Sequence, residues 1–154
     1  MLRMTKQTDY GIVLMTHLAQ AASGQFSAPE LAEALRIPPP MVSKILKLLA
    51  RDGLLASHRG VHGGYALARP AAEISVAQVI AALEGSLAMT ECGETDHGDC
   101  LREPFCAVRG NWQVINRVVR RALESITLAE MARPGSPAEL VRLGGHRPAA
   151  QPLA

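Results

Sequence analysis

Apolar residues in the first part of the chain recur every three or four positions, the spacing typical of helices. The first such stripe consists of Tyr10, Val13, Leu14, Leu18 and Ala21. It predicts a helix with Thr8 as its cap, because a threonine hydroxyl can accept a hydrogen bond from an unpaired amide of the first turn.

A second helix is predicted after Ser27, because residues 27–30 (SAPE) have the form of a capping box, a serine with a glutamate three residues later. Prolines 38–40 must end this helix, since proline lacks an amide donor and disfavours the helical conformation of the residue before it. Pro40 can occupy the first turn of a third helix, which we expect over residues 41–52.

The third helix has an apolar side and a basic side. The apolar side consists of Met41, Val42, Ile45, Leu48 and Leu49. On another face lie Lys44, Lys47 and Arg51, with Ser43 beside them. Two helices joined by a tight turn, with a basic stripe on the second, are typical of a helix-turn-helix that docks in a major groove. A merely solvated amphipathic face is the alternative for the stripe alone.

Two short apolar segments, 54–57 and 65–68, predict a pair of strands after the third helix. The turn between them is glycine-rich and basic, with His58, Arg59 and His62. A hairpin placed directly after a helix-turn-helix makes a winged helix, so the combination predicts DNA binding. An arginine at the tip of such a wing can enter a minor groove.

The second half of the chain predicts two more helices. Ser75 caps the first, which Gly85 ends, and the second becomes regular near Asn111. A seam with alternating steps of four and three residues runs along the last helix through Val108, Trp112, Ile115, Val119, Ala122 and Ile126. This heptad spacing favours a dimer helix, with an ordinary core helix of one chain as the alternative.

The expected fold is therefore mostly α-helical with a small β-hairpin wing, a winged helix-turn-helix followed by a long C-terminal dimerisation helix. We expect a DNA-binding domain at 1–70, a connecting helix at 71–87, a cysteine loop at 88–107, a dimerisation helix with a short terminal helix at 108–132, and a disordered tail at 133–154. The tail is rich in Pro, Gly, Ala and Arg.

Composition and charge narrow the class of protein. The 154 residues are 48% hydrophobic but only 3% aromatic, which favours one helical domain with an aliphatic core. No apolar run of about 18 residues and no signal-peptide core is visible, so we expect a cytoplasmic protein without a membrane span. Residues 1–70 carry a net charge of +4 and the remainder −2, which favours a polyanionic partner for the first part. No nucleophile–base pair or phosphate-binding loop is evident, so we expect no enzyme.

All three cysteines of the chain, Cys92, Cys100 and Cys106, lie in one polar segment without apolar periodicity. A segment with little core of its own and three thiols is typical of a loop that a metal or cluster orders. Thiolates suit zinc, copper(I) or an iron–sulfur cluster, and the lack of a CxxC motif disfavours an ordinary zinc ribbon. Small buried hydrophobic residues are the alternative role for free cysteines.

Several motifs together resemble the Rrf-type winged-helix regulators, which include IscR-like and NsrR-like proteins. These motifs are LRMTKQTDYG, GLLASHRGVHGGYALARP, MTEC with the two later cysteines, and SITLAEM. The resemblance covers about residues 1–132, and TDYG, MTEC and VRGNW are most similar to the regulators of the SUF iron–sulfur assembly system.

The resemblance implies a homodimer that binds double-stranded operator DNA and couples the state of an iron–sulfur cluster to expression of SUF-type assembly genes. By position, it implies that Cys92, Cys100 and Cys106 hold the cluster. The expected DNA contacts are Ser43, Lys44, Lys47, Arg51, Arg59 and His62, with Ser43 and Lys44 in the major groove and Arg59 in the minor groove.

The fourth cluster ligand departs from the IscR-like pattern. Those proteins use a histidine three residues after the last cysteine, where this chain has Arg109, and a guanidinium has no lone pair for a metal. NsrR-like relatives can use an aspartate at the start of the first helix, and Asp9 matches that position. We prefer Asp9 over the local rivals His97, Glu91, Glu94, Asp96 and Asp99. The cluster type is open between 2Fe–2S, which we favour, and 4Fe–4S.

Two other functions use the same residues. One is a zinc-stabilised or thiol-redox winged-helix protein that binds DNA, in which the thiols make a closed structural site. The other is a cluster carrier that keeps the winged-helix scaffold without binding DNA. DNA affinity that is indifferent to the state of the cluster would favour the carrier.

Overall fold

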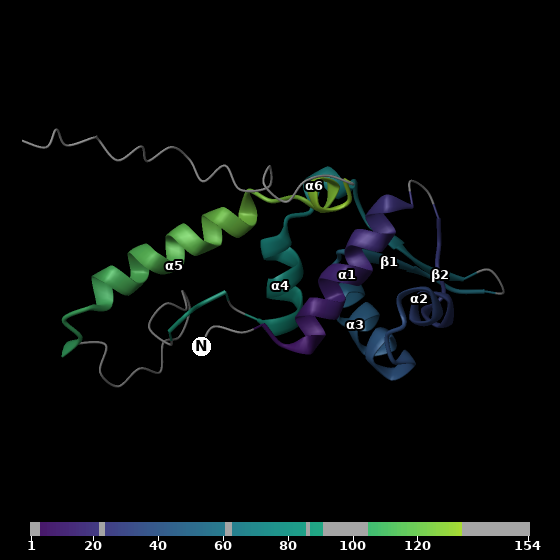
Figure 1. Ribbon diagram of the computed structural model, residues 1–154, viewed down its shortest axis with the longest axis horizontal. Helices are drawn as coiled ribbons and strands as arrows, with labels where there is room; N and C mark the ends of the chain where they lie inside the picture. Colours follow the sequence, from purple (N-terminus) through teal and green to yellow (C-terminus); the bar gives the residue numbers. More distant parts are fainter. Residues whose placement is uncertain (1–3, 22–23, 61–62, 86, 91–104, 134–154) are drawn as a thin grey trace, which may run out of the picture.

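The computed structural model describes residues 4–21, 24–60, 63–85, 87–90 and 105–133, and Figure 1 shows how their elements are arranged. In chain order the elements are α1 (Lys6–Gln20), α2 (Ala28–Leu35), α3 (Pro39–Arg51), β1 (Leu55–His58), β2 (Gly64–Leu67), a 3₁₀ turn (Ala71–Glu73), α4 (Val76–Glu84), α5 (Arg109–Glu124) and α6 (Leu128–Met131). The predicted fold class is confirmed, because helices dominate and β1 and β2 form a two-stranded antiparallel hairpin. The predicted tail beyond Arg133 lies outside the described residues.

Helix starts are set by hydroxyl caps, as the sequence predicts at two of three positions. Ser27 accepts a hydrogen bond from the Glu30 amide, and the Glu30 carboxylate accepts one from the Ser27 amide at 2.7 Å. Ser75 and Gln78 form the same reciprocal pair at the start of α4. The prediction of Thr8 as the cap of α1 is wrong: Thr5 is the cap, and Thr8 lies fully buried in the first turn.

The helix-turn-helix closes through a left-handed residue. Arg36 ends α2 with φ 53° and ψ 39°, a conformation that non-glycine residues seldom adopt. It turns the chain so that Ile37 is buried and α3 begins at Pro39, two residues earlier than expected. The buried side of α3 consists of Val42, Ile45, Leu46 and Leu49. Met41 and Leu48, predicted on that side, are only partly buried, because Leu46 occupies the centre of the packed face.

One apolar core joins α4 to the winged helix. The largest fully buried side chains are Leu14, Met15, Leu31, Ile45, Leu46, Leu49, Ile74, Val42, Val79 and Leu128. Because Val79 and Leu83 of α4 belong to the same cluster as residues of α1 and α3, α4 is packed against the predicted DNA-binding elements. The short α6 closes this core, with the Leu128 amide donating to the Ile74 carbonyl at 2.9 Å.

The hairpin lies one residue away from its predicted position on each strand, with Leu55 opposite Leu67 and His58 opposite Gly64. Phe26 extends it, since Phe26 and Tyr65 exchange two main-chain hydrogen bonds of 3.0 and 2.9 Å. Gly64 permits this approach: a Cβ atom there would lie 2.7 Å from the Phe26 carbonyl oxygen.

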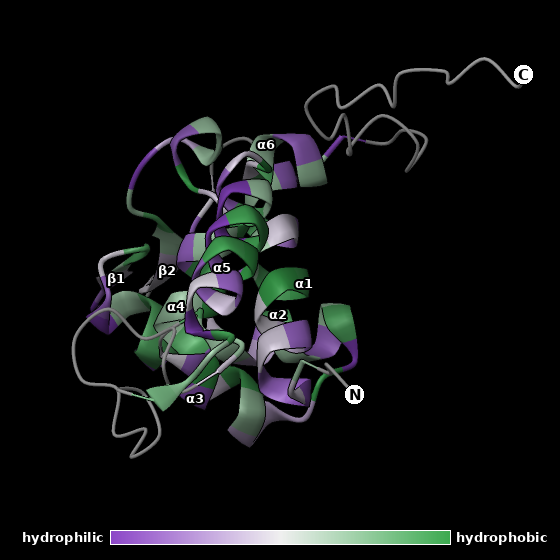
Figure 2. Ribbon diagram, turned by 90° about the vertical axis from the view of Figure 1, so that its left-hand side faces the viewer, coloured by the Kyte–Doolittle hydropathy of each residue, from purple (hydrophilic) through white to green (hydrophobic). Residues whose placement is uncertain are grey.

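Helix α5 extends away from the rest of the molecule (Figure 1), packing against α4. It begins at Arg109 and includes Gly110, so it starts two residues before the expected regular helix. Figure 2, coloured by hydropathy, shows that α5 carries both apolar and polar residues. Its exposed apolar side chains are Val114, Ile115, Val118 and Val119.

Candidate DNA-binding surface and cysteine loop

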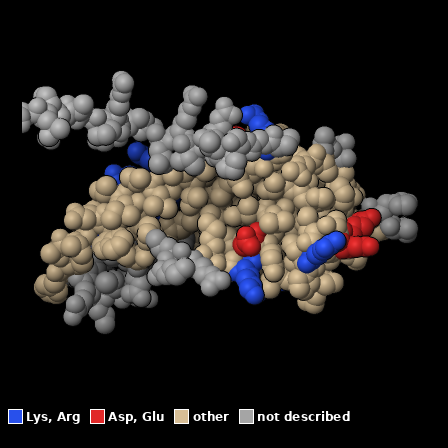
Figure 3. Space-filling view, viewed as in Figure 1, with Lys and Arg blue, Asp and Glu red and all other residues tan. Residues whose placement is uncertain are grey.

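The exposed face of α3 carries the predicted basic stripe. Lys44, Lys47 and Arg51 are exposed and Ser43 is half-buried, opposite the buried Val42, Ile45, Leu46 and Leu49. α3 itself contains no acidic residue. On the face of the molecule shown in Figure 3, charged side chains are few and of both signs, so no broad basic patch covers that face.

The three cations of α3 are not equivalent. The Arg51 Nε atom lies 3.3 Å from an Asp52 carboxylate oxygen, with the two side chains 70% and 37% exposed. An exposed pair of this kind contributes little to the free energy of unfolding. It does place an acidic group beside the Arg51 guanidinium at the C-terminal end of α3. Among the described residues Lys44 and Lys47 have no acidic partner of this kind, so they are the stronger candidates for DNA contacts.

The wing holds Arg59 at the outer end of the hairpin, exposed and directly after β1. The turn needs glycine at two positions. Gly60 has a φ of 123°, and its carbonyl accepts a hydrogen bond from the Gly63 amide at 2.9 Å. A Cβ atom on Gly63 would lie 2.4 Å from the His58 carbonyl oxygen. The predicted contact His62 lies outside the described residues.

Main-chain hydrogen bonds join the wing to α3. The Leu54 amide donates to the Leu49 carbonyl at 2.9 Å, and the Ala68 amide donates to the Leu54 carbonyl at 3.1 Å. Leu54 and Leu55 are both buried, which fixes the base of the hairpin on the core. The base of the wing is therefore held against α3, the helix that carries the basic stripe.

The cysteine segment is described only at its two ends. Cys106 is half-buried in the turn that leads into α5, and its carbonyl accepts a hydrogen bond from the Arg109 amide at 3.2 Å. Cys92, Cys100, His97 and the loop acids Glu91, Glu94, Asp96 and Asp99 lie outside the described residues. In the part of the chain that the structure describes, no three His, Cys, Asp or Glu side chains gather closely enough to hold a metal ion. Of the predicted ligands, Cys106 and the exposed Asp9 of α1 lie in the described chain.

A buried asparagine, which the sequence analysis did not single out, anchors the entrance of this segment. The Met89 amide donates to Asn116 Oδ1 at 3.0 Å, and Asn116 is 6% exposed on the inner face of α5. The amide nitrogen, Asn116 Nδ2, is buried and has no hydrogen-bond partner among the described residues. The chain thus enters the cysteine segment on α5 and leaves it through Cys106 into the same helix. A lone asparagine inside a helical pattern gave no signal of this role.

A second contact missed from the sequence joins α1 to the end of α4. The Thr5 and Thr8 hydroxyls both donate to Glu84 Oε1, and Gln7 Nε2 donates to the Leu83 carbonyl at 3.0 Å. The hydrogen bond from Thr5, followed by that from Thr8, lowers the pKa of Glu84 because both stabilise the carboxylate. We call these residues, Thr5, Gln7, Thr8 and Glu84, the α1–α4 clasp. The clasp fixes the start of the DNA-binding domain to the helix that leads toward the cysteines.

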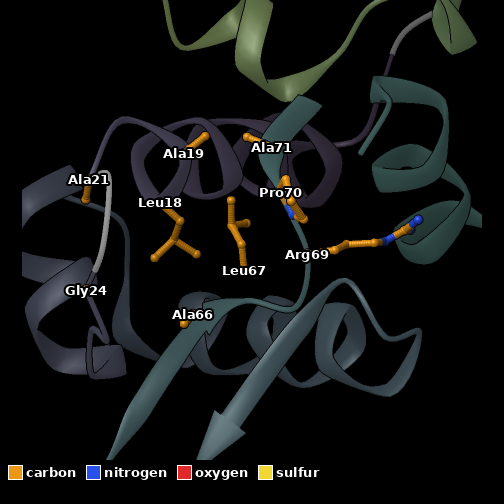
Figure 4. Close-up of a pocket in the computed structure, with 9 residues that line it drawn as sticks. All are labelled: Leu18, Ala19, Ala21, Gly24, Ala66, Leu67, Arg69, Pro70 and Ala71. Atoms are coloured by element: carbon orange, nitrogen blue, oxygen red, sulfur yellow. The ribbon is translucent and has the colours of Figure 1, made fainter. Parts of the chain in front are cut away.

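A hollow of about 300 Å³ lies beside the C-terminal half of α1, lined by Leu18, Ala19, Ala21, Gly24, Ala66, Leu67, Arg69, Pro70 and Ala71. In Figure 4 the Arg69 side chain extends away from Leu18 and Leu67. Among these lining residues Arg69 alone has a polar side chain, so the hollow offers few side-chain groups that could orient a ligand.

Comparison with known proteins decides the family. The family model described as "Rrf2: Iron-dependent Transcriptional regulator" matches residues 4–134. The chain belongs to the Rrf2 family. The Rrf-type resemblance seen in the sequence is thereby confirmed, and this Rrf2 protein is a DNA-binding transcriptional regulator, as expected, and not an enzyme.

Curated relatives match along nearly their whole length. Rv1287 of Mycobacterium tuberculosis (strain ATCC 25618 / H37Rv), an HTH-type regulator by name, is 38% identical over 144 residues, covering 92% of this chain and 88% of Rv1287. The protein rrf2 of Nitratidesulfovibrio vulgaris is 32% identical over 136 residues, covering 88% and 90% of the two chains.

Solved structures share the fold. IscR of T. potens has a TM-score of 0.67 and 30% identity, covering 92% of this chain and 93% of its own. CymR, described as the global cysteine regulator of B. subtilis, has a TM-score of 0.68 and 29% identity, covering 86% and 97%. None of the helices in the described ranges is both long and apolar enough to cross a membrane.

Proposed function

We propose that this Rrf2 protein is a homodimeric iron–sulfur regulator, which binds operator DNA with α3 and the wing and controls SUF-type cluster assembly genes. The observation that carries the cluster assignment is the arrangement of the three thiols. They lie in one segment whose entrance is hydrogen-bonded to α5 at Asn116 and whose exit, at Cys106, leads into α5. The iron dependence in the description of the family supports the same assignment.

The donor set fits an iron–sulfur cluster. Cys92, Cys100 and Cys106 would hold it as thiolates, the soft ligands that iron–sulfur clusters use. Cys106 is a half-buried free cysteine next to the start of α5. When bound, the cluster would supply an iron centre sensitive to oxidants and nitric oxide.

Asp9 is our candidate for the fourth ligand. Its carboxylate is exposed on α1, so it is available to a group outside its own helix, including the cysteine segment of a second copy. Asp9 directly follows Thr8, whose hydroxyl is held by Glu84 in the α1–α4 clasp. Ligation by Asp9 would therefore tie the first turn of the DNA-binding domain to the cluster. Under that arrangement, cluster and DNA must change each other's affinity by the same factor.

The dimer contact is proposed along α5. Val114, Ile115, Val118 and Val119 are 55%, 41%, 59% and 37% exposed and lie on one face. A second copy of α5 is the occupant that self-complementary packing of such a face favours. The face differs from the predicted seam: Ile115 and Val119 belong to both, whereas Trp112 and Ala122 are half-buried.

The test is anaerobic purification with iron and sulfide assays and an absorption spectrum. We expect a coloured protein that holds iron and sulfide, and the spectrum distinguishes 2Fe–2S from 4Fe–4S. Cys106→Ala should lose the colour. Asp9→Ala should change the spectrum or stability of the cluster, whereas Glu33→Ala, a matched exposed acid on α2, should not. Colourless protein with stoichiometric zinc would contradict the cluster and indicate a structural zinc site instead.

A further inference from the structure

The start of α3 has no free main-chain donor. In most helices the amides of the first turn lack partners within the helix and can donate to a capping side chain or to an anion such as phosphate. Here the N-cap and the first two helical residues are Pro38, Pro39 and Pro40, which have no N–H group. The next amide, of Met41, donates to the Pro38 carbonyl at 2.9 Å. The N-terminus of this helix therefore cannot donate a main-chain hydrogen bond to a phosphate.

This inference rests on the proposed function, under which the start of α3, with its proline rings, meets the DNA. Pro39 and Pro40 are exposed. Pro40 precedes Lys44, Lys47 and Arg51 by four, seven and eleven residues, so it is the N-terminal member of the same stripe. In a helix-turn-helix, the N-terminal residues of this helix contact base edges.

The prolines are also held rigidly. Ile37 on one side is 5% exposed and its amide donates to the Ala32 carbonyl at 3.1 Å, and Val42 on the other side is fully buried. Each ring fixes its own φ angle, so little conformational freedom is lost when the rings pack against a partner. A rigid apolar surface is thus presented at the end of a basic stripe.

We infer that Pro40, flanked by Pro39, recognises a thymine methyl group in the major groove and selects thymine at one position of each half-site. The thymine 5-methyl is the apolar group that base pairs present in that groove, whereas the other base-edge atoms are hydrogen-bond donors and acceptors that a proline ring cannot satisfy. Lys44 and Lys47, further along the stripe, bind phosphates or guanine edges. Specificity at the proline position therefore comes from shape and apolar contact.

The experiment removes single methyl groups from DNA. Duplexes that the wild-type protein enriches from a random library are resynthesised with each thymine replaced in turn by deoxyuridine, which keeps the base pair. We expect affinity to fall roughly fourfold at one thymine of each half-site, the change for exposing about one buried methyl group. In Pro40→Ala the same replacement should have no effect. Pro29→Ala, a matched exposed proline at the start of α2, should keep the wild-type response.

A second measurement uses only the wild-type protein, so it does not depend on the variant folding. The sensitive thymine–adenine pair is replaced by cytosine–guanine and by 5-methylcytosine–guanine. We expect the added methyl to restore affinity roughly fourfold relative to plain cytosine. Tight, selective binding without any methyl effect, or an equal effect in Pro40→Ala, would overturn the inference and leave the proposed function intact. A library from which no sequence is enriched would refute operator binding by α3, and the inference with it.

Discussion

The α1–α4 clasp allows the effect of a substitution at Thr8 on stability to be predicted. This residue is fully buried, and its hydroxyl donates to Glu84 Oε1. Thr8→Val keeps the size of the side chain and removes the donor. A hydrogen bond to a charged acceptor is worth about 1.5–3 kcal/mol, but Glu84 is exposed and water can replace part of the loss. We therefore expect the free energy of unfolding to fall by about 1 kcal/mol.

The same helix supplies a matched control. Thr16 Oγ1 is buried and has no hydrogen-bond partner in the described part of the chain, so Thr16→Val removes a hydroxyl that makes no hydrogen bond there. It should leave stability unchanged or raise it slightly, because an unpaired buried polar atom is costly. Urea unfolding at one fixed protein concentration measures both variants, and concentration must be fixed because dimerisation shifts apparent stability.

The loss in Thr8→Val should depend on pH. The hydroxyls of Thr5 and Thr8 lower the pKa of Glu84 below its ordinary value of 4.5 in the folded state. A lowered folded pKa adds stability above the unfolded pKa, and this stability is lost as the pH falls through the folded pKa. The difference between wild type and Thr8→Val should thus be full at neutral pH and shrink below about pH 4. A loss no larger than that of Thr16→Val, or an equal loss at pH 3 and pH 7, would refute the role of the clasp.

Three further predictions concern the wing, the dimer and the DNA contact. Gly64→Ala should lower the free energy of unfolding in urea by about 1–3 kcal/mol, because the new Cβ would lie 2.7 Å from the Phe26 carbonyl oxygen. Gly110→Ala should raise it, because a Cβ there would have no atom within 4 Å and alanine favours the helix. Val118→Asp should turn a sedimenting dimer into a monomer, and Gln113→Asp, elsewhere on α5, should not; an intact Val118→Asp dimer would exclude this face. Lys47→Ala should reduce the slope of log affinity against log salt by about 0.9, while Arg117→Ala leaves it unchanged; equal slopes in all three proteins would exclude a phosphate contact by Lys47.

Local signals predicted the elements that local interactions determine. The capping boxes at Ser27 and Ser75 satisfy their own helix starts within three residues, so the sequence alone shows them. The basic stripe of α3 and the glycines of the wing follow for the same reason. Each depends on side-chain spacing or backbone conformation within a few residues.

Long-range contacts explain the errors. Thr8 resembles a cap in the sequence, but its hydroxyl donates a hydrogen bond to Glu84, 76 residues further along the chain. Thr5 caps the helix instead. Heptad spacing along α5 could not decide which apolar residues face its own chain. Helix α5 packs against α4, and along it Asn116 is buried and Trp112 half-buried while Val114 and Val118 are exposed. The anchor between Met89 and Asn116 depends on the same packing and has no local signature.

The hydrogen bond from the Leu54 amide to the Leu49 carbonyl joins the base of the wing directly to the end of α3. Under the proposed function, the distance along the duplex between a base contacted by the start of α3 and the minor groove that Arg59 would enter is therefore set by the protein. The two contacted positions of the operator would need to have the same spacing. Inserting a single base pair between those two positions would cost one of the two contacts, even if every recognised base were kept.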